Sequence, residues 1–155
     1  MLRMSKLADY GTVLMAAMAK DAEAVHSATG LARKLGMAAP TVSKILKMLV
    51  REGLLASTRG AHGGYRLPHP PSAISVARII RALDGPIGMT ECSTTPGLCP
   101  QESRCTVRAN WMRVNHVVLE VLNGITLEQL NLPAPGIVKV ESIGRRGTAI
   151  PRRAQ

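Results

Sequence analysis

Three cysteines lie close together in the sequence, and thiols are side chains well suited to bind metal ions or to change redox state. They are Cys92, Cys99 and Cys105, spaced C-x6-C-x5-C among Ser, Thr, Pro and Gly residues. Buried structural cysteines usually lie on helices or strands, whereas this stretch shows neither the hydrophobic period of a helix nor that of a strand. The pattern therefore predicts an irregular loop whose thiols have a chemical role.

Four roles are open for this cysteine loop: an iron-sulfur cluster, a zinc ion, metal-free redox thiols, or no special role. Wide spacing with glycine and proline favours a cluster, because a multi-iron core needs thiolates from several directions. Zinc sites more often have closely paired cysteines such as C-x2-C, and a redox switch needs only two thiols. An odd cysteine count also argues against a disulfide framework and favours the reducing cytoplasm.

Helices are predicted on both sides of the cysteine loop. One follows the proline-rich stretch 68–71, is capped by Ser75 and stops at Gly85. The other covers about 106–123, and its apolar residues recur at steps of four and three, the period of a coiled-coil seam. We expect this helix to pack on its own domain and on a second copy of the chain, the alternative being an ordinary buried helix. The seam residues are Val107, Trp111, Val114, Val118, Val121 and Ile125.

Helical periodicity occurs three more times before residue 53. Ser5 can cap a helix that reaches Lys20, and Ser27 can cap a shorter one that ends before Gly36. A third begins at Pro40, and a tight turn joins it to the second, as in a helix-turn-helix. A solvated helix face is the alternative to DNA binding. The third helix presents a polar and cationic face made of Thr41, Ser43, Lys44, Lys47 and Arg51.

A glycine-rich hairpin is predicted directly after the third helix. One strand begins at Leu54 and Leu55, and its partner covers 65–67. At this place a hairpin is a wing, because it lies beside two helices that could bind DNA. Glycines in the tip permit a close approach to a sugar-phosphate backbone, and cations beside it would bind phosphates. The residues concerned are Arg59, Gly63, Gly64 and Arg66.

The net charge of +10 is concentrated at the two ends of the chain. Residues 1–66 hold 10 Lys and Arg against 4 Asp and Glu, residues 67–130 hold 5 of each, and residues 131–155 hold 5 against 1. Such an excess points to a polyanion, most often nucleic acid. No apolar run could span a bilayer, and no paired acid-base constellation, phosphate loop or nucleophile signature indicates an enzyme. We expect a DNA-binding protein with no membrane partner and no small-molecule substrate.

Over about residues 2–130 the chain resembles the Rrf-two (Rrf2) family of winged-helix regulators. The match rests on residues 2–10, on 39–44, on R-G-x-x-G-G-Y at 59–65, on D-G-P-I at 84–87 and on the cysteine loop. The resemblance implies a mainly α-helical fold with a small β-hairpin wing and a long dimerisation helix. The winged helix-turn-helix domain would cover 1–67, the iron-sulfur-binding loop and dimerisation helices 68–130, and a flexible basic tail 131–155.

The resemblance also implies a function: a cytoplasmic, homodimeric repressor of SUF-type iron-sulfur cluster assembly genes that senses a cluster. A 2Fe-2S cluster is favoured over 4Fe-4S, and the operator would be pseudo-palindromic double-stranded DNA. Thr41, Ser43 and Lys44 would lie nearest to base edges. Pro40 and the wing glycines would set the approach. Phosphate contacts would come mainly from Lys47, Arg51, Arg59 and Arg66.

Cys92, Cys99 and Cys105 would be the thiolate ligands, and the fourth ligand is open. One branch of the family has His three residues after the last cysteine, where this chain has Arg108, which cannot ligate iron. Another branch takes an Asp near the start of the first helix of the other subunit, a position that Asp9 matches. Asp9 is equally explained as a first-turn acid favoured by the helix dipole. Weaker candidates are Glu91, Glu102 and His116.

Two other functions are open at this point. A regulator of the same family could sense nitric oxide or redox state and act on other genes. A cysteine-dependent redox protein or electron carrier is the more remote alternative.

Overall fold

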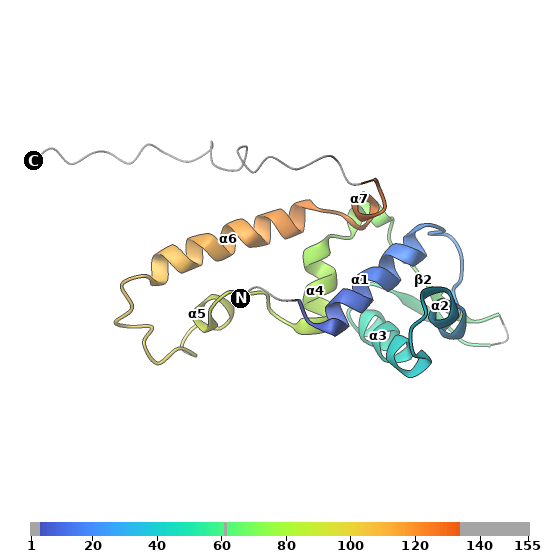
Figure 1. The fold of residues 1–155 in the computed structure, drawn as a ribbon, viewed down its shortest axis with the longest axis horizontal. Coiled ribbons are helices and arrows are strands. Elements are labelled where there is room, and N and C mark those ends of the chain that lie inside the picture. Colours follow the sequence, from blue (N-terminus) through green and yellow to red (C-terminus); the bar gives the residue numbers. More distant parts are fainter. Residues whose placement is uncertain (1–3, 61, 134–155) are drawn as a thin grey trace, which may run out of the picture.

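The computed structural model describes residues 4–60 and 62–133, and within them the chain is mainly helical with one small hairpin (Figure 1). This confirms the predicted fold class. The elements are α1 (Lys6–Ala19), α2 (Ala28–Leu35), α3 (Ala39–Arg51), β1 (Ala56–Thr58), β2 (Gly64–Arg66), the 3-10 helix η1 (Pro71–Ala73), α4 (Val76–Asp84), α5 (Glu91–Thr94), α6 (Arg108–Gly124) and α7 (Leu127–Leu130). The predicted basic tail lies outside the described residues, apart from its first three.

Local capping decides where the first helices begin and end. The Ser5 hydroxyl accepts the Ala8 N–H at 3.1 Å, and the Ser27 hydroxyl accepts the Gly30 N–H at 3.0 Å. Gly36 has a φ of 64° at the end of α2, a left-handed conformation that suits glycine. The three predicted helices are therefore confirmed, with ends that differ by a residue or two.

The core joins the helix-turn-helix to the later helices. Leu14 of α1, Ile45 of α3, Ile79 of α4 and Leu127 of α7 are fully buried in one cluster. Burial of each such side chain contributes roughly 1.5–3 kcal/mol. The Asn131 amide also donates to the Ala16 carbonyl at 3.1 Å. The segment after α6 is therefore fixed to α1, and α4 and α7 share the core of the winged helix.

The hairpin starts two residues later than predicted. Leu54 and Leu55 are buried, and their N–H groups both bond to the Leu49 carbonyl, at 2.9 and 3.3 Å. They complete the end of α3 after Gly53, which has a φ of 69°, and so are not free to form a sheet. The strand prediction at these two residues was wrong, whereas the antiparallel pairing of β1 with β2 is as expected.

The wing glycines are required by packing within the chain itself. His26 and Tyr65 exchange backbone hydrogen bonds of 2.8 and 2.9 Å, so the segment that leads into α2 lies against β2. A Cβ atom at Gly64 would lie 2.6 Å from the His26 carbonyl oxygen, and one at Gly63 would lie 2.4 Å from the Thr58 carbonyl oxygen. Both contacts are with backbone that cannot easily move. The predicted closeness of these glycines to DNA stays a prediction.

A Gly64→Ala substitution is expected to lower the free energy of unfolding by about 1–3 kcal/mol, because the added methyl group pushes β2 away from His26. Thermal unfolding should show a midpoint lower by roughly 2–4 °C for each kcal/mol. Gly124→Ala is the matched control, since nothing lies within 4 Å of its Cβ position. Equal midpoints for the two variants would contradict this account of the hairpin.

The long helix α6 extends away from the winged-helix body, over α5 and the cysteine loop (Figure 1). It begins at Arg108 after the N-cap Val107, two residues later than predicted, and Asn115 is its one buried residue. Most of its apolar side chains are thus exposed within one chain. None of the described helices is long and apolar enough to cross a lipid bilayer.

Candidate nucleic-acid interface and cysteine loop

Helix α3 separates an apolar face from a cationic one. Its inner face is fully buried: Val42, Ile45, Leu46 and Leu49. Among the predicted DNA-binding residues, Pro40, Lys44, Lys47 and Arg51 are exposed, and Thr41 and Ser43 are half-buried. The exposed side of α3 can therefore enter a DNA groove without disturbing the core.

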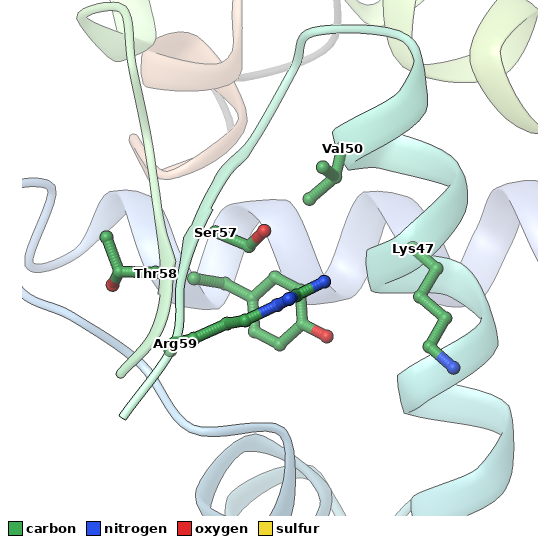
Figure 2. A pocket seen from close by; sticks show the side chains of 7 residues that line it. Lys47, Val50, Ser57, Thr58 and Arg59 are labelled. Carbon is green, nitrogen blue, oxygen red and sulfur yellow. The ribbon is translucent and has the colours of Figure 1, made fainter. Parts of the chain in front are cut away.

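A cleft of about 290 Å³ lies between α3 and the hairpin. Its cations come from two segments, Lys47 from α3 and Arg59 from the residue after β1, and both line the cleft (Figure 2). Neither cation forms an ion pair with any described acidic residue. The cleft therefore offers unneutralised positive charge to an anion. It is lined by Lys47, Val50, Ser57, Thr58, Arg59, Gly64 and Tyr65.

Two predicted cations are not among the residues that line this cleft. Arg51 pairs with its neighbour Glu52 at 3.3 Å, but both side chains are exposed and such a pair contributes little. Arg66 is exposed on β2. Tyr65 was missed among the site residues, although its place after the paired glycines was the available signal. The structure thus brings Lys47 and Arg59 to one cleft and leaves Arg51 and Arg66 outside its lining.

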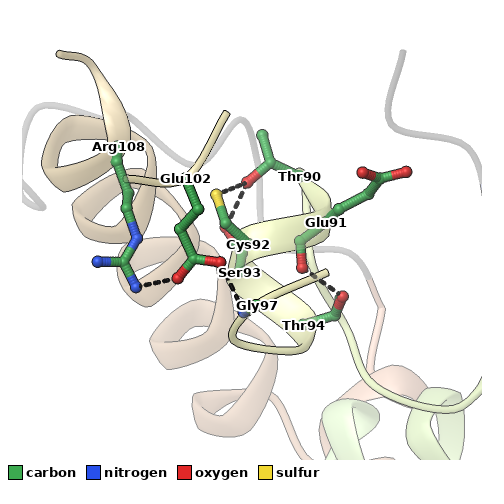
Figure 3. A network of polar contacts seen from close by, with 8 residues as sticks. All are labelled: Thr90, Glu91, Cys92, Ser93, Thr94, Gly97, Glu102 and Arg108. Carbon is green, nitrogen blue, oxygen red and sulfur yellow. Dashed lines mark hydrogen bonds and ion pairs between the residues drawn. The ribbon is translucent and has the colours of Figure 1, made fainter. Parts of the chain in front are cut away.

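The first cysteine lies on a short helix, where the sequence predicted only an irregular loop. Cys92 is buried in α5, and its Sγ atom lies 3.3 Å from the Thr90 hydroxyl oxygen, which is itself 2.6 Å from the Ser93 hydroxyl (Figure 3). Cys99 and Cys105 are half-buried outside any helix, and all three thiols are free. These hydrogen bonds between neighbouring polar side chains support a short helical turn where the sequence shows no apolar period.

The cysteine loop is attached to α6 by polar contacts. The Met89 N–H donates to the Asn115 side-chain oxygen at 3.1 Å. Glu102 accepts the Gly97 N–H at 2.6 Å with one carboxylate oxygen and pairs with Arg108 Nη2 at 2.6 Å through the other (Figure 3). The loop is therefore folded back on the same helix that carries the predicted dimer seam.

The side chains of the loop are of the type that binds iron-sulfur clusters, since three free thiols lie within one segment. Across residues 4–60 and 62–133, however, no three His, Cys, Asp or Glu side chains form a group that could hold a metal ion. Asp9 is exposed in the first turn of α1 and is not grouped with the thiols of its own chain. The thiols would have to draw together to bind a cluster.

The seam of α6 divides between two environments. Val107, Trp111, Val114 and Val121 are 39–49% exposed, so the described part of the chain leaves them largely uncovered. Val118 instead helps to line a groove of about 500 Å³ between α4 and α6, together with Met4, Ile80, Met89 and Leu122. One side of α6 therefore faces its own domain, and the adjacent apolar side is open.

Comparison with known proteins places this fold and these sites in a family. Residues 4–131 match the model of the Rrf2 family, described as an iron-dependent transcriptional regulator. The transcriptional regulator CymR of Bacillus subtilis is 32% identical over 130 residues, which cover 83% of this chain and 89% of CymR. IscR of Yersinia pseudotuberculosis is 32% identical over 113 residues, which cover 69% of this chain and 68% of IscR.

Solved structures show the same fold. CymR, titled the global cysteine regulator of B. subtilis, has a TM-score of 0.67 at 33% identity and covers 84% of this chain and 97% of its own. IscR of T. potens has a TM-score of 0.64 at 29% identity and covers 83% of this chain and 85% of its own. The expectation of a DNA-binding regulator and not an enzyme is thereby confirmed. The chain belongs to the Rrf2 family of winged-helix transcriptional regulators.

Proposed function

We propose that this regulator acts in the cytoplasm as a homodimeric, cluster-sensing repressor of SUF-type iron-sulfur cluster assembly genes. The observation that carries the proposal is the attachment of a loop with three free thiols to α6, the helix that also has an open apolar face. A change in the loop can therefore reach the contact between two copies. The division into a reading domain at 1–67 and a sensing and dimerisation region at 68–130 belongs to the same proposal.

DNA would be read by α3 and clamped by the wing. The N-terminal half of α3, with the half-buried Thr41 and Ser43 and the exposed Lys44, would face base edges in the major groove. A backbone phosphate would enter the cleft between Lys47 and Arg59. Two copies joined through α6 would place two such surfaces on half-sites about one helical turn apart, hence a pseudo-palindromic operator.

A 2Fe-2S cluster would be held by Cys92, Cys99 and Cys105, with Asp9 of a second copy as the candidate fourth ligand. When bound, it would supply a group whose presence depends on cellular iron, sulfur and oxidants. Asp9 lies in the exposed first turn of α1, so a neighbouring copy could reach it. This supports a ligand contributed across the dimer, which would link cluster binding to dimer geometry.

A second polar connection leads from the loop to the DNA-binding helices. The Asp84 carboxylate, at the end of α4, accepts the Ser5 N–H at 3.3 Å and the Ser5 hydroxyl. Asp84 directly precedes Gly85, where the chain turns toward the cysteine loop. Since Ser5 caps α1, a rearranged loop can shift α1 as well as α6. Such a shift would bias the spacing of the two reading surfaces.

A metal-free thiol sensor is the second candidate. The thiols are not grouped in the described residues, and the relative CymR is titled a cysteine regulator. Anaerobic purification with iron and sulfide analysis separates the two, followed by footprinting on the chain's own promoter region. Cluster-loaded and metal-free protein should differ in operator affinity by at least about tenfold at matched salt. Equal affinities would refute cluster sensing.

A Lys47→Met substitution is expected to weaken operator binding about tenfold at low salt and to flatten its salt dependence. A dimer that loses two phosphate contacts should lose roughly 1.8 from the slope of log affinity against log salt. Arg78→Met, which removes an exposed cation of α4 outside the cleft, is the control. Equal slopes for the two variants would place Lys47 away from the DNA backbone.

A further inference from the structure

The cysteine loop is held to α6 at two points, and neither involves a thiol. Asn115 receives the Met89 N–H at the start of the loop, and Arg108 pairs with Glu102 near its end. Arg108 and Asn115 are seven residues apart, which places them on the same face of a helix, two turns from each other. The loop therefore lies along one side of α6, between these two contacts.

Glu102 occupies the centre of the second contact. Its side chain is 16% exposed, and both carboxylate oxygens are used, one by Arg108 Nη2 and one by the Gly97 N–H, each at 2.6 Å (Figure 3). It follows Cys99 by three residues and precedes Cys105 by three. The carboxylate thus ties both arms of the loop, each of which carries a thiol, to the first turn of α6.

The contact is stronger than an exposed ion pair would be. Charge-assisted hydrogen bonds that share one shielded carboxylate hold a definite geometry. The Arg108 Nε atom is buried with no hydrogen-bond partner among the described residues, and the Nη2 atom of the same guanidinium binds Glu102. Loss of either side chain leaves the other partly buried and unsatisfied.

We propose that Glu102 and Arg108 are positioning residues for the cysteine thiols: their ion pair closes residues 97–108 on α6 before any cluster binds, and so sets the exposure of Cys99 and Cys105. Arg108 acts by orienting the loop and not by ligation. The biological purpose of the pair rests on the proposed cluster-sensing function. The ion pair itself forms without a bound metal and can be tested in metal-free protein.

The test is site-resolved alkylation of full-length, reduced, metal-free protein with iodoacetamide, followed by mass spectrometry. Glu102→Gln and Arg108→Gln should each raise the labelling rates of Cys99 and Cys105 by about tenfold, because the closed form no longer dominates. Cys92, held in α5 by other contacts, should change less than about twofold. The double variant should match either single one, since both remove the same interaction.

Three further arms distinguish a positioning pair from general destabilisation. Arg108→Lys keeps the charge and should restore slow labelling at least in part. High salt should speed the labelling of the native chain toward the variants' rate, because the Arg108 side chain is 41% exposed and the pair is screened. Arg104→Gln, at an exposed loop cation with no described ion pair, is the control and should behave as the native chain.

Unchanged labelling in Glu102→Gln and Arg108→Gln, or effects that add in the double variant, would overturn the proposal. A rise at Cys92 equal to that at the other two thiols would also overturn it, since that result means general unfolding. Iron and sulfide analysis of the native protein runs in parallel. A native chain that binds no iron would refute the cluster-sensing function and leave the labelling result standing.

Discussion

Val114→Asp is expected to convert the proposed dimer of this regulator into a monomer. Val114 is 42% exposed in the middle of the apolar side of α6 that residues 4–60 and 62–133 leave open. A second copy would bury it, and an unpaired carboxylate in an apolar contact costs several kcal/mol. Because both copies carry the change, the dissociation constant should rise at least about a thousandfold, equivalent to roughly 4 kcal/mol. Sedimentation equilibrium between micromolar and hundred-micromolar concentration measures this directly.

Asn123→Asp is the matched control. It adds the same charge to the same helix at an exposed position that is not part of the seam. It should remain a dimer with nearly unchanged thermal stability. A native chain that is already monomeric at these concentrations would refute the dimer. A dimeric Val114→Asp variant would show that α6 is not the contact between the two copies.

Loss of the dimer should abolish tight operator binding although every DNA-contacting residue remains. In a dimer the second half-site is bound at an effective concentration set by the first, which is worth 10²–10⁴ in affinity, as an order of magnitude. The monomer should therefore bind a single half-site weakly and with a flatter salt dependence. Gel shifts with full and half operators distinguish this loss from damage to α3, which would weaken both.

Features that depend on neighbouring residues were predictable from the sequence. Ser5 and Ser27 cap their helices as expected, and Gly36 ends α2, because each acts within about four residues. The last short helix, α7, begins by the same local logic, with reciprocal bonds between Thr126 and Gln129. These elements need no knowledge of the rest of the fold.

Features that depend on distant partners were not predictable. Leu54 and Leu55 read as a strand because β-hairpins often follow such a helix, yet their burial and their bonds to Leu49 hold them at the end of α3. The cleft between Lys47 and Arg59 exists only because β1 returns alongside α3. The pattern of charge or hydropathy along one chain does not predict which distant segments will lie side by side.

The long helix shows both cases at once. Its four-three repeat predicted an apolar seam, and the exposed Val114 and Val121 agree with a surface meant for another copy. The repeat did not reveal that Val118 would line the groove to α4, or that Asn115 would be the best buried residue. Asn115 is buried because it binds the Met89 N–H next to the cysteine loop, a polar contact that the apolar heptad pattern does not predict.

The second large effect is expected from Cys105→Ser, which should lower the iron and sulfide content to less than about a tenth of the native value. A serine hydroxyl is a much poorer iron ligand than a thiolate, and three thiols leave no spare. Ser103→Ala, an exposed position of the same loop, should retain the native content. Asp9→Ala tests the fourth ligand separately, and an unaltered cluster spectrum and stability would remove Asp9 from the set.

Cys105→Ser also tests whether the proposed cluster controls DNA binding. Cys105→Ser should bind the operator as metal-free native protein does, with the same salt slope, because α3 and the cleft lie apart from Cys105. Its affinity should not respond to anaerobic iron and sulfide, whereas that of the native chain should shift by at least about tenfold. A Cys105→Ser protein that still responds would assign the switch to a different site. One that neither binds DNA nor dimerises would show that Cys105 is needed for folding, and Cys99→Ser would then carry the test.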